Sequence, residues 1–367
     1  MKFTVTKEEL LRPLQLVSGV VERRQTMPIL SNVLLQNSNN ELTLTATDLE
    51  VEIVAKTFLD KSVSEGATTV PIKKFLDSCR TLPEEAKLQF ESKDDKVLLR
   101  SGKIRFTLST LPADEFPSVE TSQQLFTFDI PQNKLKTLID KTYFAMAIQD
   151  VRFYLNGLLL ELSNNQVRTV ATDGHRLAMC TIPGEFQLTE PLKIIIPRKA
   201  VIELTRLLED AEDKATIVIG NNYIQIKLTD TIFTSKLIDG EYPNYTMVIP
   251  PGEGDYIVAN KFALRQCLIR ASVLSNEKYR GIRIEIKDNK LKAVAINPEH
   301  EEAEDELAVE FSGDKLKIGF NVSYLVDAIS AISDDTVNIK IANSNKCALI
   351  TQEQGEDCLY VVMPMRL

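Results

Sequence analysis

Short stretches that alternate apolar and polar residues recur three times along the chain, at residues 32–48, 156–173 and 280–297. In each stretch the alternation has the two-residue period of a β-strand, breaks at a polar turn and resumes, which predicts a pair of adjacent strands. The stretches end on Asp48, Asp173 and Asn297, which are 125 and 124 residues apart. A repeat of this length has the size of a domain and is too long for a solenoid unit.

The rest of each third repeats the same order of elements. A short extended segment precedes an amphipathic helical pattern, which is predicted at residues 7–22, 133–147 and 260–274. A second, shorter helix follows another extended segment, at residues 73–82, 198–208 and 321–332. Pro13 lies inside the first helix, where we expect it to kink or delay the helix.

We therefore predict an α+β fold of three tandem copies of one domain, each with two helices packed on β-sheets. The predicted domains are residues 1–125, 126–253 and 254–367. The composition agrees, because 44% hydrophobic and 26% charged residues are ordinary for globular proteins and 367 residues are too many for one core. No apolar run reaches the roughly 18 residues of a membrane span. Since the start of the chain also lacks the apolar core of a signal peptide, we expect a cytoplasmic protein.

The five cysteines are scattered along the chain, and none forms a Cys-x-x-Cys pair. This pattern favours neither a disulfide framework nor a zinc site. We expect these thiols to be buried and reduced, and we expect neither a metal nor a cofactor.

The net charge of −9 by itself argues against binding to nucleic acid, because a phosphate backbone repels an acidic protein. The charges are unevenly distributed, however. Six helix windows hold 16 Lys and Arg but only 7 Asp and Glu. The windows are residues 7–24, 72–82, 132–142, 198–208, 260–272 and 321–332. Lys and Arg also favour helices intrinsically, but Glu does so equally and is scarce in these windows. Basic helices that all face one partner would predict a polyanionic partner.

Four segments resemble those of the bacterial DNA polymerase III beta subunit family, the sliding clamps. They are LVSGVVERR with PILSN at 16–32, ATDGHRL at 171–177, LSNEKYRG at 274–281 and VMPMRL at 362–367. The resemblance covers the whole chain, in order and at the length of the family.

The resemblance implies a head-to-tail homodimer that closes a ring of pseudo-sixfold symmetry, with helices lining the hole and sheets outside. Such a ring encircles duplex DNA without sequence specificity and tethers the replicative polymerase. The partners it implies are a second copy of the chain, DNA polymerase III alpha subunit, the clamp-loader delta subunit, translesion polymerases, mismatch repair proteins and DNA ligase. No membrane partner is implied.

The basic ends of helices, together with the resemblance, suggest residues that contact DNA. These candidates are Arg24, Gln149, Tyr154, Arg198 and Lys199.

A second candidate site is a cleft that grips a short apolar peptide of partner proteins. Gly174 breaks a strand pattern beside apolar residues, and the chain ends on an apolar tail whose methionines suit several partners. The resemblance joins these segments into one cleft between the second and third domains. Its candidate residues are Leu155, Thr172, Gly174, His175, Arg176, Leu177, Pro243, Val248, Tyr324, Val361, Met363, Pro364, Met365 and Arg366.

Opposite charges beside apolar pairs predict the subunit interface. One side combines basic residues with an alternating strand, and the other combines the end of a helix with the densest acidic run, at residues 299–306. The candidates are Lys74, Lys103, Arg105, Phe106 and Leu108 on one side, and Val273, Leu274, Glu301, Glu304 and Asp305 on the other.

Two other classes of function compete with this interpretation. An enzyme is disfavoured, because the Asp173-Gly174-His175-Arg176 segment lacks a nucleophile motif, and the chain has only two histidines and no Gly-rich phosphate loop. A β-rich scaffold that binds peptides without DNA would keep the same cleft. Such a scaffold would not need basic helices.

Overall fold

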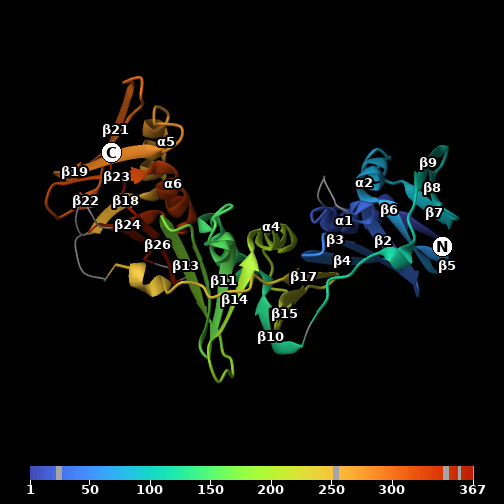
Figure 1. The fold of residues 1–367 in the computed structure, drawn as a ribbon. Coiled ribbons are helices and arrows are strands. Elements are labelled where there is room, and N and C mark those ends of the chain that lie inside the picture. The colour runs from blue at the N-terminus through green and yellow to red at the C-terminus, as the bar shows by residue number, and fades with distance from the viewer. Residues whose placement is uncertain (22–26, 122, 251–255, 342–346, 354–356, 367) are drawn as a thin grey trace. The chain divides into compact units, whose positions relative to one another are not determined.

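The structure is a computed structural model, which describes residues 1–21, 27–121, 123–250, 256–341, 347–353 and 357–366. The chain forms two compact units, and Figure 1 labels their elements. Unit 1 comprises Met1–Leu135 and Ile202–Leu237, and unit 2 comprises Lys136–Val201 and Ile238–Leu367. The chain passes from one unit to the other within α3 (Gln132–Asp140), within α4 (Arg198–Leu207) and again after Leu237.

Unit 1 contains two antiparallel sheets. The five-stranded sheet has the order β5-β1-β7-β8-β9, and the eight-stranded sheet has the order β10-β15-β16-β17-β4-β3-β2-β6. The strands of the first sheet are β1 (Lys2–Thr6), β5 (Lys61–Ser64), β7 (Lys87–Lys93), β8 (Lys96–Ser101) and β9 (Ile104–Ser109). Those of the second are β2 (Asn32–Ser38), β3 (Glu41–Thr47), β4 (Val51–Phe58), β6 (Gly66–Pro71), β10 (Gln124–Pro131), β15 (Lys214–Gly220), β16 (Tyr223–Lys227) and β17 (Thr231–Lys236). The helices are α1 (Lys7–Ser18) and α2 (Ile72–Arg80), with short 3₁₀ turns η1 (Pro28–Ser31) and η2 (Ala113–Glu115).

Unit 2 also contains two sheets. A nine-stranded sheet has the order β14-β11-β12-β13-β26-β25-β24-β18-β22, and a four-stranded sheet has the order β21-β20-β19-β23. The first consists of β11 (Gly157–Ser163), β12 (Gln166–Thr172), β13 (Arg176–Pro183), β14 (Leu192–Pro197), β18 (Tyr256–Asn260), β22 (Glu310–Phe311), β24 (Thr336–Ile341), β25 (Ala348–Thr351) and β26 (Asp357–Val362). The second consists of β19 (Gly281–Lys287), β20 (Lys290–Ile296), β21 (Glu302–Ala308) and β23 (Leu316–Asn321). The helices are α5 (Lys261–Ser272) and α6 (Val322–Ala331), with 3₁₀ turns η3 (Tyr143–Ala145), η4 (Phe153–Asn156) and η5 (Tyr245–Val248).

The predicted strand pairs are confirmed in all three repeats. Strands β2 and β3, β11 and β12, and β19 and β20 are each antiparallel neighbours. Alternate residues of these strands are buried, for example Leu42 and Leu44 on β3. Because the side chains alternate with a period of two, each strand pair packs one apolar face against a hydrophobic core.

Local capping explains why helices follow strands directly. Thr6 ends β1 and forms a capping box with Glu9, so that α1 begins at once. Asn260 and Asn321 end β18 and β23, and each side chain accepts a hydrogen bond from the first turn of the next helix. Pro13 does not delay the helix, because α1 begins at Lys7 and continues through the buried Pro13 to Ser18.

The prediction that all thiols are reduced is wrong for one pair. Cys180 on β13 lies directly across from Cys358 on β26, and the two form a disulfide although they are 178 positions apart in the sequence. Cys79 and Cys267 are buried free thiols, and Cys347 is a partly exposed one. The sequence spacing could not reveal the pair, because only the register of two distant strands brings it together.

Strands β13 and β26 are adjacent in the middle of the nine-stranded sheet (Figure 1). Their register places Leu177 beside Val361 and Arg176 beside Val362. The turn at residues 173–175 and the C-terminal tail therefore leave the sheet at the same end. Within the described ranges, none of the helices is long and apolar enough to span a membrane.

Candidate functional site

A cavity of about 180 Å³ opens in unit 2 where the turn before β13 meets the end of β26. Its lining comes from five segments: η4 with the residue before it, the end of β12 with the turn that follows, the start of β13, the residues around η5, and the end of β26 with the tail. The lining residues are Arg152, Leu155, Thr172, Gly174, Arg176, Leu177, Pro243, Asn244, Tyr245, Val248, Val361 and Met363. We call this cavity the cleft.

The floor of the cleft is a buried apolar cluster. Leu155, Leu177 and Val361 belong to it, and each is at most 3% exposed. Val248 on the wall is 37% exposed. An apolar side chain that enters the cleft would therefore leave water for an apolar surface, which is favourable by about 25 cal/mol per Å² buried.

The turn from Thr172 to Arg176 is fixed by its own hydrogen bonds. One oxygen of Asp173 accepts bonds from the backbone N–H groups of His175 and Arg176, at 2.9 and 3.0 Å. Thr172 accepts a bond from the N–H of Gly174 at 3.1 Å and donates one to the carbonyl of Arg176 at 2.6 Å. Gly174 has a φ of +86°, and a Cβ there would lie 3.0 Å from the Arg152 guanidinium, so glycine suits this position.

Arg176 connects three segments through its guanidinium. Its Nε donates to Asp173 at 3.1 Å, its Nη1 to Asp327 on α6 at 2.6 Å and its Nη2 to the carbonyl of Phe144 at 2.6 Å. The guanidinium also lies 4.4 Å from the ring centroid of Tyr324, which is a cation–π distance. These bonds join the start of β13 to helix α6.

Arg152 lies at the rim of the cleft and is held by Asp150. Its Nε and Nη2 donate to the two carboxylate oxygens of Asp150 at 3.0 and 2.9 Å. These bonds lower the pKa of Asp150 to about 2. Nη2 also approaches the carbonyl of Asp173 at 3.4 Å. The positive charge is therefore kept beside the turn that contains Gly174.

Tyr245 supports the opposite wall. Its hydroxyl donates to Glu161 at 2.5 Å and accepts from Arg168 at 3.1 Å. Burial, together with the bond to Glu161, raises the pKa of Tyr245. The hydroxyl anchors η5, which also contains Val248.

Nine of the residues that the sequence suggested for the cleft line it in the structure. They are Leu155, Thr172, Gly174, Arg176, Leu177, Pro243, Val248, Val361 and Met363. The other five candidates lie outside the lining: His175, Tyr324, Pro364, Met365 and Arg366.

Three of these other candidates have defined contacts nearby. The carbonyl of His175 accepts a hydrogen bond from the N–H of Met363 at 2.9 Å, and Tyr324 lies against Arg176. The N–H of Met365 donates to the carbonyl of Gly319 at 2.9 Å, which ties the tail to β23. Sequence reasoning missed Arg152, Asn244 and Tyr245. The only local signal was the Asp150-x-Arg152 spacing, which suits an ion pair.

The candidates for DNA contact lie in different environments. Gln149 is exposed, whereas Tyr154 packs against the apolar cluster below the cleft. Arg198 begins α4 and donates to the carbonyl of Met146 at 3.2 Å; partial burial, aided by the positive charge of Arg176, lowers its pKa. Lys199 is half-buried on the same helix. Arg24 lies outside the described residues.

The interface candidates of unit 1 lie on and beside strand β9, apart from Lys74 on α2. Strand β9 is the last strand of its sheet, so one edge of it has no neighbour among the described strands. Lys103 precedes this strand, and Arg105, Phe106 and Leu108 lie on it. A basic edge strand with partly buried apolar residues therefore ends this sheet.

The interface candidates of unit 2 lie near α5 and β21. Val273 caps α5 and is 74% exposed, and Leu274 follows it. Glu304 and Asp305 lie on β21, which is the last strand of the four-stranded sheet, and Glu301 precedes it. Asp305 is paired with Arg270 at 2.6 Å, and Glu304 is paired with Lys292 at 2.5 Å.

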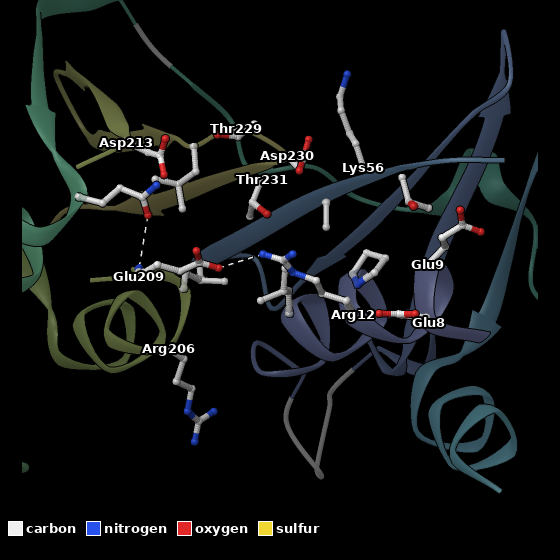
Figure 2. Close-up of a pocket in the computed structure, with 17 residues that line it drawn as sticks. Glu8, Glu9, Arg12, Lys56, Arg206, Glu209, Asp213, Thr229, Asp230 and Thr231 are labelled. Atoms are coloured by element: carbon white, nitrogen blue, oxygen red, sulfur yellow. Dashed lines mark hydrogen bonds and ion pairs between the residues drawn. The ribbon is translucent and has the colours of Figure 1, made fainter. Parts of the chain in front are cut away.

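A larger hollow of about 400 Å³ lies in unit 1, between α1 and the region around the end of α4 (Figure 2). We call it the groove. An ion pair of 2.9 Å joins Arg12 to Glu209 across it, and both side chains are more than 60% exposed. Eight of the 17 residues that line it are charged, among them Glu8, Glu9 and Asp230. Across the part of the chain that the structure describes, no three His, Cys, Asp or Glu side chains are grouped as metal ligands.

Comparison with known proteins assigns the family. The three models of the DNA polymerase III beta subunit match in order: the N-terminal domain at residues 1–120, the central domain at 129–244 and the C-terminal domain at 246–366. The chain is 48% identical to the beta sliding clamp of Pseudomonas aeruginosa and 47% identical to that of Escherichia coli K12, over 100% of each protein.

Solved structures agree with this assignment. A sliding clamp from Pseudomonas aeruginosa bound to griselimycin has a TM-score of 0.96 at 48% identity, with 100% of both chains covered. One from Bartonella birtlesii, also bound to griselimycin, has a TM-score of 0.95 at 35% identity over 100% of both chains. Three tandem helix-and-sheet domains of this kind define a DNA sliding clamp, a non-catalytic processivity factor of replication. The predicted fold class is thereby confirmed. The chain belongs to the DNA polymerase III beta subunit family.

Proposed function

We propose that two copies of this chain close head to tail into a ring around duplex DNA in the cytoplasm, and that the cleft recruits partners through a short apolar peptide. The observation that carries the recruitment step is the apolar floor of Leu155, Leu177 and Val361, which opens to solvent at Val248 and Met363. The peptide would place leucine and aromatic side chains on this floor. Its backbone would run along the turn at residues 174–176 and the tail at residues 363–366.

The partners of the cleft would be DNA polymerase III alpha subunit, the clamp-loader delta subunit, translesion polymerases, mismatch repair proteins and DNA ligase. Met363 is a flexible and polarisable side chain, which suits a surface that accepts several sequences. A single cleft would make these partners compete, because each would use the same apolar floor.

The ring would close through two edge strands of opposite charge. Strand β9 carries Arg105 and is preceded by Lys103, whereas β21 carries Glu304 and Asp305. Edge strands have backbone groups available for pairing with another chain. Phe106 and Leu108 on one side would meet Val273 and Leu274 on the other, and Lys74 and Glu301 would add charge complementarity. A contact of this kind between unlike surfaces forms a ring when the rotation from one subunit to the next closes, and we propose closure after two subunits.

Contacts with DNA would be made to phosphates and would carry no sequence information. The proposed contacts are Arg24, Gln149, Tyr154, Arg198 and Lys199. The three proposed domains are residues 1–125, 126–253 and 254–367, each supplying two helices toward the duplex.

The decisive experiment measures retention of the protein on nicked circular DNA after loading with clamp loader and ATP, before and after the circle is linearised. A ring stays on the circle and leaves the linear ends, because its hold on DNA is topological. Retention that is absent, or that does not change on linearisation, would refute the ring and favour a peptide-binding scaffold.

A substitution at the proposed interface tests ring closure separately. Leu274→Asp places a charge in the apolar contact and should give monomers that still bind the peptide but are not retained on circles. Leu125→Asp is a matched control, because Leu125 is 51% exposed and lies outside the proposed interface. An intact Leu274→Asp dimer by sedimentation would count against this interface.

A further inference from the structure

We propose that Asp327 is a positioning residue of the peptide cleft: from helix α6 it holds Arg176, and through Arg176 it fixes the turn that forms one lip of the cleft. The inference rests on the proposed function of the cleft and adds a residue that lies outside its lining. No family motif of the sequence pointed to Asp327.

The contact that carries the inference joins two elements 151 residues apart. Nη1 of Arg176 donates to Asp327 at 2.6 Å, a charge-assisted hydrogen bond. The Arg176 side chain is only 13% exposed, whereas Asp327 is 42% exposed. Asp327 therefore reaches a mostly buried guanidinium from the solvent side.

The bond is one part of a connected arrangement. The same guanidinium binds Asp173, whose other oxygen accepts the N–H groups of His175 and Arg176. Asp327 is thus linked, through Arg176 and Asp173, to the backbone that faces the peptide. Tyr324 lies one turn before Asp327 on α6 and covers the guanidinium at 4.4 Å.

Loss of Asp327 would leave Arg176 with its hydrogen bonds to Asp173 and the Phe144 carbonyl and with its contacts to the rings of Phe144 and Tyr324. The guanidinium would lose its charge-assisted hydrogen bond to α6 and be held less firmly, so the lip at Gly174 would be tied to that helix through the Tyr324 ring contact instead. A peptide would have to order this lip when it binds, and ordering of that kind lowers affinity without removing a direct contact.

The test uses the full-length protein and a synthetic peptide that carries leucine and phenylalanine, labelled with fluorescein. Asp327→Asn keeps the size of the side chain and removes the charge. It should weaken peptide binding by about threefold to tenfold, as expected for one partly exposed charged hydrogen bond. Asp314→Asn removes the same charge from an exposed position between β22 and β23 and should bind like the parent protein.

Two readouts separate positioning from general damage to the fold. Asp327→Glu restores the carboxylate and should regain part of the affinity. In a double-mutant cycle, Asp327→Asn should cause little further loss of peptide affinity in a protein that already carries Arg176→Gln, because the partner of Asp327 is gone. Thermal unfolding confirms that each variant is folded. If Asp327→Asn does not fold, the peptide affinity of Asp327→Glu is compared with that of the parent protein instead.

The outcomes distinguish this inference from the proposed function. If the parent protein does not bind the peptide, the proposed function fails and the inference fails with it. If the parent binds and Asp327→Asn binds equally well, or if the two substitutions are additive, the inference alone is overturned. Coupled losses with rescue by glutamate would support it.

Discussion

The cleft and the groove show that size does not identify a binding site in this molecule. The groove in unit 1 has about 400 Å³ and the cleft in unit 2 only about 180 Å³. Eight of the 17 residues that line the groove are charged and an exposed ion pair bridges it, whereas the cleft has an apolar floor and two charged residues, Arg152 and Arg176, among the 12 that line it. Charged groups in the groove are already well solvated by water, so a ligand would gain little there.

The two hollows also differ in how their walls are held. Across the groove, one exposed ion pair joins Arg12 to Glu209, and the backbone N–H of Glu209 donates to Gln132 at 3.3 Å. In the cleft, Arg176, Arg152 and Tyr245 are each tied by several hydrogen bonds to groups behind the lining. A rigid apolar surface binds more tightly than a flexible one, because less ordering is needed. Four substitutions or truncations test this difference, in order of decreasing effect.

Removal of residues 363–367 should have the largest effect. It deletes Met363 from the cleft and the hydrogen bond from Met363 to the carbonyl of His175. Peptide binding should fall by more than about 100-fold, or about 2.7 kcal/mol, as measured by fluorescence polarisation. Sedimentation should still show a dimer, and a monomer would contradict the separate placement of cleft and interface.

Val248→Asp should weaken peptide binding by roughly tenfold to 100-fold. A carboxylate on the wall would have to lose water when an apolar peptide covers it, which is costly without a partner. Val248 is 37% exposed, so the free protein should fold normally. The control is Val63→Asp in unit 1, where Val63 is 57% exposed. Titration with the labelled peptide compares the affinities of Val248→Asp and Val63→Asp. Equal affinities would refute the role of Val248 in peptide binding.

Tyr245→Phe should destabilise the protein by about 1–3 kcal/mol, because Glu161 and Arg168 lose a buried hydrogen-bond partner. Chemical denaturation measures this free energy of unfolding. Peptide affinity should fall several-fold as η5 becomes less fixed. Tyr279→Phe, at a 58% exposed tyrosine, should change neither quantity. An unchanged stability in Tyr245→Phe would mean that the hydroxyl network contributes nothing.

Arg12→Ala should have the smallest effect. Its ion pair with Glu209 has side chains that are 72% and 62% exposed, so solvent screens it and its loss should cost no more than about 1 kcal/mol. Peptide affinity should be unchanged. Denaturation and peptide titration test both statements, and a clear loss of peptide binding would show that the groove is functional after all.

The repeated elements and the family follow from the amino-acid sequence. All six predicted helices occur, because a helix depends on periodicity and caps within a few turns. Helix α2 at Ile72–Arg80 is close to the predicted residues 73–82, whereas the helix predicted at 133–147 is too long, since α3 ends at Asp140. The strand pairs were equally predictable, since their turns are local. The resemblance to the sliding clamps also pointed to nine of the residues that line the cleft.

Which distant residues meet, in contrast, depends on the tertiary structure. The disulfide of Cys180 with Cys358 follows from the register of β13 and β26, which no local pattern specifies. The bond from Arg176 to Asp327 and the network of Tyr245 likewise join residues 151 and 84 positions apart. Periodicity tells which face of an element is buried, but which element covers that face depends on the packing of the whole unit.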